Sequence, residues 1–247
     1  MTVIHSDSAE GTIVWQQQDS LVTLTLHRPH AANAYTASML AQLDESLHRI
    51  ESDPAISTVV ITGAERWFCA GADHRERDAR DWRSVVELPS AGVFQRLARC
   101  PAVTIAAVNG AAVGGGLELA LAADLRFACA AATFALPELT LGLLPAAGGI
   151  DRLPELVGPM AARQLILGGV VWSAEDAFRH GLILDVTPDL AGLQQRVADY
   201  AGRIATRETT ALRLAKQRLS SGIQMSSDAT RLAQALLVAR PSNTKAN

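Results

Sequence analysis

Short segments rich in β-branched residues alternate with segments of helical periodicity, and this alternation constrains the fold more than any other feature. Residues 12–15 and 21–26 predict a hairpin, and residues 57–62, 103–108 and 125–128 predict further strands. Apolar residues recur at helical spacing between residues 39 and 50, and residues 85–97 also predict a helix. Strands that alternate with helices indicate an α/β fold. The chain is almost entirely helical from residue 190 onward, so we expect a core over residues 1–190 and a helical region over 191–247.

Composition narrows the class of protein. Hydrophobic residues make up 49% of the 247 residues, which is enough for a substantial core, and the net charge of -3 gives no electrostatic footprint for nucleic acid. The cysteines, Cys69, Cys100 and Cys129, form neither a disulfide framework nor a zinc-site spacing. No apolar run reaches the roughly 20 residues that a membrane helix needs. The first residues lack a signal-peptide pattern, and we therefore expect a cytoplasmic protein that has no membrane partner.

Residues 103–120 run from a predicted strand through Gly114, Gly115 and Gly116 into a predicted helix. The first turn of a helix has backbone N–H groups without internal partners, and the helix dipole adds positive charge there. Glycines allow another molecule to approach this backbone closely, so the segment suits an anion or a developing oxyanion. Equally, the glycines could serve only to pack the helix tightly.

Two glutamates stand among apolar neighbours. Glu118 follows the glycines in a segment of Leu, Ala and Gly, and Glu138 follows a proline between apolar residues. Each could be a general acid or base whose pKa is tuned by burial. Alternatively, Glu118 offsets the helix dipole and Glu138 is a solvated loop acid. Residues 68–73 form a bend of small residues that either directs N–H groups into a cleft or is an ordinary tight turn.

Taken in order, these segments resemble the crotonase (enoyl-CoA hydratase/isomerase) superfamily over roughly residues 12–220. Residues 27–34 resemble the family's N-R-P-x-x-x-N-A, and residues 68–73 match F-x-A-G-A-D. Residues 107–120 match A-V-N-G-x-x-x-G-G-G-x-E-L-A. Residues 134–144 resemble F-x-x-P-E-x-x-L-G-L-x, and residues 145–149 resemble P-x-x-G-G. Several motifs in one order are far more specific than any one of them.

The resemblance implies a spiral of ββα units with a helical C-terminal trimerisation region, assembled as a homotrimer or a dimer of trimers. It also implies an acyl-CoA thioester substrate, with coenzyme A as part of the substrate and no metal or redox cofactor. Matched by position, the backbone N–H groups of Ala72 and Gly115 would form the oxyanion hole. Contacts to coenzyme A map to a further set of positions: His30, Ala31, Ala32, Ala70 and Arg75, with an exposed, solvated Arg75 as an equal alternative.

The reaction implied by the resemblance is that of an enoyl-CoA hydratase, as in fatty-acid β-oxidation. Hydratases in this family use two glutamates, which fall on Glu118 and Glu138. The pair would hold one water: Glu118 would activate it for attack at Cβ, and Glu138 would deliver a proton to Cα. A Δ3,Δ2-enoyl-CoA isomerase and a non-catalytic acyl-CoA-binding protein are the alternatives.

The sequence departs from the family pattern in three places. Ala146 replaces a glycine that lies by the catalytic water in hydratases, so we expect its methyl group to border the substrate site. The C-terminus is shorter than usual, which predicts a more open acyl pocket or one closed by a neighbouring subunit. Residues 74–82 are unusually polar, and Trp82 either walls the acyl site or lies at the surface.

Overall fold

The structure, a computed structural model, describes residues 10–73, 75, 88–220 and 238. One sheet has the strand order β1-β2-β3-β5-β7-β10, in which only β1 and β2 pair antiparallel. Its strands are β1 (Thr12–Gln18), β2 (Leu21–His27), β3 (Thr58–Gly63), β5 (Val103–Val108), β7 (Leu125–Cys129) and β10 (Val186–Thr187). The predicted hairpin is confirmed, although β1 runs on to Gln18 because its pairing with β2 continues up to the turn at Asp19.

A second, smaller sheet has the order β4-β6-β8-β9. Its strands are β4 (Trp67–Cys69), β6 (Ala111–Val113), β8 (Thr133–Ala135) and β9 (Trp172–Ser173). Each of β3, β5 and β7 is followed along the chain by one strand of this sheet, and β4, β6 and β8 lie parallel as neighbours. The segments that leave these three strands therefore emerge at one edge of the sheet. The predicted α/β class is confirmed.

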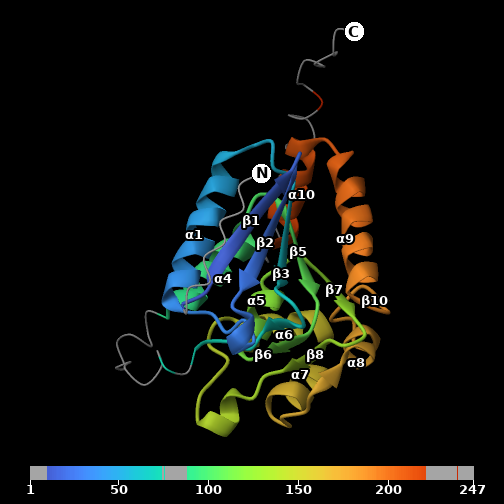
Figure 1. Cartoon of the computed structure of the whole chain (residues 1–247). Helices are drawn as coiled ribbons and strands as arrows, with labels where there is room; N and C mark the ends of the chain where they lie inside the picture. The colour runs from blue at the N-terminus through green and yellow to red at the C-terminus, as the bar shows by residue number, and fades with distance from the viewer. Residues whose placement is uncertain (1–9, 74, 76–87, 221–237, 239–247) are drawn as a thin grey trace.

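Helices cover both faces of the six-stranded sheet (Figure 1). Val59 and Ile61 of β3 pack toward α1 (Ala37–Ser52) and α4 (Pro89–Arg99), whereas Val60 faces α9 (Leu190–Ala205). This division follows from the alternation of side chains along a strand. The remaining helical elements are η1 (Pro29–Ala31), α5 (Gly115–Leu121), η2 (Glu138–Leu141), α6 (Gly149–Val157), α7 (Pro159–Ile166), α8 (Ala174–Arg179) and α10 (Thr209–Ser220).

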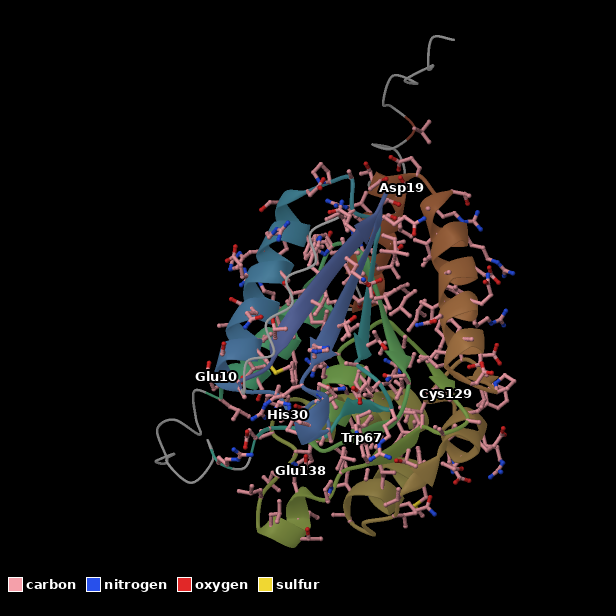
Figure 2. All side chains as sticks on the ribbon, in the orientation of Figure 1. Glu10, Asp19, His30, Trp67, Cys129 and Glu138 are labelled. Carbon is pink, nitrogen blue, oxygen red and sulfur yellow. The ribbon has the colours of Figure 1, made fainter. Side chains whose placement is uncertain are left out.

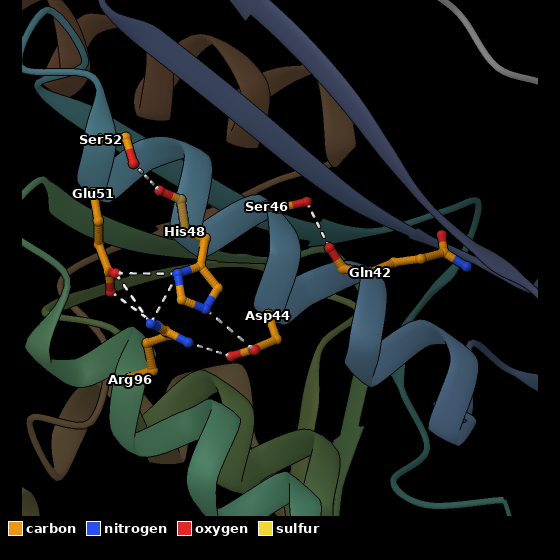
Figure 3. A network of polar contacts seen from close by, with 7 residues as sticks. All are labelled: Gln42, Asp44, Ser46, His48, Glu51, Ser52 and Arg96. Carbon is orange, nitrogen blue, oxygen red and sulfur yellow. Dashed lines mark hydrogen bonds and ion pairs between the residues drawn. The ribbon is translucent and has the colours of Figure 1, made fainter.

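Helices α1 and α4 are joined by a polar network around Arg96 (Figure 3). The Arg96 guanidinium donates to Asp44 Oδ1 and Glu51 Oε1 at 3.0 Å each, and its Nη2 lies 3.0 Å from His48 Nδ1. The two carboxylates raise the pKa of Arg96. One cation thus fixes the position of α4 against α1 on the side of the sheet where the glycine-rich segment lies.

Helix α4 begins at Pro89, where proline suits the first position of a helix because its missing N–H would have no intrahelical partner. The predicted helix began at residue 85, and residues 85–87 lie outside the described part of the chain. The same is true of the polar stretch 74–82, including Trp82, apart from Arg75.

The predicted helical region is confirmed for α9 and α10, which pack against the six-stranded sheet. An ion pair with a buried lysine anchors α10: Lys216 Nζ lies 2.6 Å from Asp124 Oδ2 and donates to the Ala102 carbonyl at 2.7 Å. The domain division at residue 190 and a trimerisation role for residues 191–247 stay predictions. Within the described residues, no helix is both long and apolar enough to cross a lipid bilayer.

Candidate active site

Two buried asparagines hold the bends that lead from the large sheet into the small one. Asn109 Oδ1 accepts from Gly63 N, and its Nδ2 donates to the Gly63 carbonyl at 2.9 Å. The Asn33 and Asn109 amides both donate to the Trp67 carbonyl, at 2.8 and 3.2 Å. A methyl group on Gly110 would overlap the Arg66 carbonyl, so the backbone passes too closely there for any side chain. These polar anchors explain why the R-P-x-x-x-N-A and A-V-N-G segments contain Asn33 and Asn109.

The three glycines that follow β6 meet three different constraints. Gly114 has φ +56°, in the left-handed region that glycine adopts without strain, and its N–H donates to the Ala135 carbonyl of β8 at 2.8 Å. A methyl group on Gly115 would overlap the hydroxyl of Tyr35, and one on Gly116 would overlap the Cys69 carbonyl. Close packing therefore accounts for Gly116, one of the two interpretations left open by the sequence.

Ala72 and Gly115 are brought together at this edge. Tyr35 pairs with the 71–73 segment: its N–H donates to Gly71 O at 2.8 Å, and its carbonyl accepts from Asp73 N at 3.0 Å. The Ala72 N–H therefore points away from Tyr35. A methyl group on Gly71 would lie 3.2 Å from Gly115 N, so the two segments lie side by side. Within the described part of the chain, neither the Ala72 N–H nor the Gly115 N–H has a hydrogen-bond partner.

An ion pair fixes the chain directly after Ala72. Arg28 Nη2 lies 2.7 Å from Asp73 Oδ2; the Arg28 side chain is buried, and the Asp73 side chain is 11% exposed. The Asp73 carboxylate also accepts from the Arg75 N–H, and these partners lower its pKa. The arginine of the R-P motif thus stabilises the segment that carries one of the candidate oxyanion donors.

Glu118 is buried on α5, with only 4% of its surface exposed. Its Oε1 accepts from the Gly149 N–H at 2.8 Å. Burial raises the pKa of the Glu118 carboxyl from 4.5 to about 7; the negative charge of Glu138 adds to this, while the bond from Gly149 opposes it. The side chain does not act as a solvated helix-terminal acid, and its proton affinity suits acid–base chemistry near neutral pH.

Glu138 begins η2, directly after β8, and approaches the same glycines. Its Oε1 would lie 3.0 Å from a methyl group on Gly114. Its Oε2 is buried and has no hydrogen-bond partner among the described residues, and burial raises the pKa of this carboxyl. Figure 2 shows Glu138 at the same end of the molecule as His30 and Trp67. A buried carboxyl oxygen without a partner is uncommon and calls for a functional explanation.

Arg152 is a member of the site that the sequence analysis did not single out. Its Nη1 donates to the Ala147 carbonyl and its Nη2 to Gln95 Oε1 on α4, each at 2.9 Å. The guanidinium charge lowers the pKa of Glu118, and burial lowers its own pKa. The only signal in the sequence is a basic residue one turn after the Gly148-Gly149 helix start, which is too common to be informative.

The predicted coenzyme A positions gather beside the 70–73 segment. Ala70 N donates to the Ala32 carbonyl at 3.1 Å, which joins Ala32 and its neighbours His30 and Ala31 to the oxyanion segment. The side chain of Arg75 is 84% exposed and lies 4.0 Å from Asp73 Oδ1. The structure brings these residues together at one edge, and their contacts to coenzyme A stay predictions.

Ala146 has an exposed side chain, and its φ is not positive. Its methyl group therefore causes no backbone strain, and the neighbouring Gly149 still bonds Glu118. The nearby position that requires glycine is Gly148, at φ +108°, where a methyl group would overlap the Arg152 guanidinium. A contact between Ala146 and substrate stays a prediction.

Comparison with known proteins gives one consistent family. The model of the enoyl-CoA hydratase/isomerase family matches residues 16–246. The crotonyl-CoA hydratase of Syntrophomonas wolfei is 36% identical over 89% of this chain and 85% of its own length. The 2,3-dehydroadipyl-CoA hydratase of Escherichia coli is 39% identical over 84% of this chain and 81% of its own. The crystal structure of an enoyl-CoA hydratase from Bacillus anthracis superposes with a TM-score of 0.85 at 34% identity, covering 92% of this chain and 89% of that one.

Proposed function

Because the chain belongs to the enoyl-CoA hydratase/isomerase family, we propose that it is an enoyl-CoA hydratase that adds water reversibly, with syn geometry, across the 2,3 double bond of a 2-enoyl-CoA thioester. Relatives named as hydratases of crotonyl-CoA, 2,3-dehydroadipyl-CoA and short-chain enoyl-CoA substrates support this reaction class. The proposed setting is fatty-acid degradation by β-oxidation.

The observation that carries the proposal is the meeting of a buried and a half-buried carboxyl beside two backbone N–H groups that have no partner among the described residues. Glu118 comes from α5 and Glu138 from η2, and the charge of Glu138 raises the pKa of Glu118. Two carboxyls in such proximity resist ionising together, so one proton can be held by the pair. The N–H groups of Ala72 and Gly115 would stabilise the enolate oxygen that forms in the same step.

In the proposed step, water adds to Cβ and a proton adds to Cα. The Glu118 carboxylate accepts a proton from water while the water oxygen bonds to Cβ, and the neutral Glu138 carboxyl donates a proton to Cα. The enolate formed at the thioester oxygen collapses as Cα is protonated. Afterwards Glu118 holds the additional proton and Glu138 is ionised, so one proton must pass from Glu118 to Glu138 before the next turnover. Dehydration reverses these roles.

Arg152 would tune this proton transfer, because its positive charge favours the ionised form of Glu118. The assignment of Glu118 as the base and Glu138 as the acid follows the pattern of the family's hydratases. This chemistry needs no metal or redox cofactor, since the carboxyls move the protons and the amides stabilise the charge.

The test is turnover of crotonyl-CoA and longer 2-enoyl-CoAs, followed by the loss of conjugated absorbance. We expect Glu118→Gln and Glu138→Gln each to lower kcat by about 100- to 10,000-fold, the usual contribution of general acid–base catalysis. Glu45→Gln on the exposed side of α1 is the matched control and should retain activity. Full activity in either active-site variant would refute the assigned role.

The same wild-type and variant proteins distinguish a hydratase from two other candidate functions. Conversion of a 3-enoyl-CoA without hydration would indicate a Δ3,Δ2-enoyl-CoA isomerase, for which Glu138 and the oxyanion donors suffice. Tight acyl-CoA binding without any turnover would indicate a non-catalytic member of the family. The presence of Glu118 in addition to Glu138 favours hydration over isomerisation by a single acid.

We further propose self-association, as a homotrimer or a dimer of trimers. Large apolar side chains are exposed on and around α7 and α8: Met160, Leu167, Val171, Phe178 and Leu184. Exposed apolar groups gathered on neighbouring elements are typical of protein interfaces. Sedimentation velocity should give an oligomer for the wild type and a smaller species for Leu167→Glu.

A cytoplasmic location is supported by three buried cysteines that are not disulfide-bonded.

A further inference from the structure

Tyr35 directly follows the 27–34 motif and lies next to both candidate oxyanion donors. Its backbone pairs with the 71–73 segment, which carries the Ala72 donor. Its hydroxyl lies against Gly115, so close that a methyl group there would overlap it, with the ring atoms Cε1 and Cζ only 3.0 Å from the same point. One residue thus touches both segments of the proposed oxyanion hole.

The position of the Tyr35 hydroxyl relative to the Gly115 N–H follows from helix geometry. Gly115 is the first residue of α5, and every Cα–Cβ bond in a helix tilts toward the N-terminus. The free N–H groups of the first turn point in that same direction. The Tyr35 hydroxyl therefore lies toward the N-terminal side of Gly115, the side to which the Gly115 N–H also points.

The ring of Tyr35 is held firmly. The residue is 5% exposed, and its ring packs edge-on against Phe94 of α4 at a centroid distance of 5.7 Å and an interplanar angle of 87°. Such an arrangement is favourable for aromatic pairs. Fixed at both its backbone and its ring, the side chain presents the hydroxyl in one place, as a preorganised donor must.

We propose that the Tyr35 hydroxyl is a third hydrogen-bond donor to the thioester oxygen, alongside the N–H groups of Ala72 and Gly115. This inference rests on the proposed acyl-CoA site and assigns a side-chain donor to an oxyanion hole otherwise built from backbone. The hydroxyl strengthens its bond as negative charge develops on the oxygen, so its contribution is larger in the transition state than in the bound substrate.

The chain provides a matched control, because it contains only two tyrosines. Tyr200 lies on α9 and packs against Phe127, in the core on the other face of the six-stranded sheet. Tyr35→Phe and Tyr200→Phe each remove one hydroxyl and keep the ring. We expect Tyr35→Phe to lower kcat for crotonyl-CoA by about 10- to 100-fold, the effect of losing one hydrogen bond to a charged group, and Tyr200→Phe to change it less than about twofold.

Binding of 4-(dimethylamino)cinnamoyl-CoA gives a readout that a merely structural role would not move. Hydrogen bonds to the carbonyl oxygen of this chromophore shift its absorbance to longer wavelength. The shift should shrink in Tyr35→Phe and persist in Tyr200→Phe. In the Tyr200→Phe background, replacing the remaining tyrosine by 3-fluorotyrosine should enlarge the shift, because fluorine makes the phenol a stronger donor.

The chromophore separates this inference from the hydratase proposal, since its binding requires no addition of water. A wild type that hydrates crotonyl-CoA, with a Tyr35→Phe variant that keeps both its kcat and its full shift, would overturn the role of Tyr35 alone. A wild type without hydratase activity, whose chromophore shift still depends on Tyr35, would overturn the hydratase proposal and leave the third donor supported. An absorbance shift that fluorotyrosine leaves unchanged would also count against the donor.

Discussion

Glu118→Gln should stabilise the folded protein at alkaline pH, in addition to lowering turnover as proposed above. Burial raises the pKa of the Glu118 carboxyl from 4.5 to about 7, so the folded state binds this proton more tightly than the unfolded chain does. Stability is therefore lost as the pH rises from 4.5 to 7, and the full penalty is present above that window. At about 1.4 kcal/mol for each pKa unit, the penalty is roughly 3 kcal/mol at pH 8.

Glutamine keeps the shape of the side chain and can still accept the hydrogen bond from Gly149 N, but it carries no charge. In a chain of this size, about 3 kcal/mol corresponds to a melting temperature higher by roughly 6 to 12 °C. Thermal unfolding of wild type and variant at about pH 4 and pH 8 measures the difference directly, with Glu45→Gln as the exposed control. A difference of the same size at both pH values would refute the reasoning, since a packing effect does not depend on the proton.

Further predictions concern close packing, the anchor of α10 and the exposed loop. Gly116→Ala should destabilise the protein severely, because its methyl group would overlap the Cys69 carbonyl. By contrast, Gly92→Ala in α4 meets open space and should raise the free energy of unfolding, measured in urea, by up to about 1 kcal/mol. Lys216→Met should cost about 1.5 to 3 kcal/mol by removing the cation from Asp124, which keeps its hydrogen bonds from Thr104, and Asp124→Asn in the same chain should recover part of that loss. Ala146→Gly should change kcat for crotonyl-CoA less than about twofold, because the methyl group is exposed and unstrained.

The long elements could be predicted from the sequence because their patterns are local. The period-2 alternation of β2 and the helical spacing in α1 each recur often enough to identify the element, and the structure differs only at its ends. The strands β4, β6 and β8 are three residues each, too short to show any period. Yet these short strands bring the segments that carry the candidate site residues to one edge of the sheet. The arrangement of the site could therefore not be predicted from the spacing of residues in the sequence.

Contacts between distant segments were equally invisible in the sequence. Tyr35 meets Gly115 across 80 positions, and Arg152 reaches Gln95 on α4 across 57. The identity of Glu118 and Glu138 was accessible because a carboxyl among apolar residues is expensive to bury and therefore conspicuous. A tyrosine among apolar residues is ordinary, and its hydroxyl becomes informative only when the structure shows what it faces.

The motifs of this chain consist mainly of residues that leave the backbone accessible, and the site explains why. The candidate donors at Ala72 and Gly115 are main-chain groups, so the residues around them need small or absent side chains. Gly116 lies against the Cys69 carbonyl, and Gly114 permits the turn. Side chains then set the reaction, and only where a proton must move does the site place carboxyls. The proposed backbone hole could serve many acyl-CoA reactions, whereas the proposed roles of Glu118 and Glu138 would commit it to the addition of water. Changing those two residues should therefore abolish hydration while thioester binding at the amides survives.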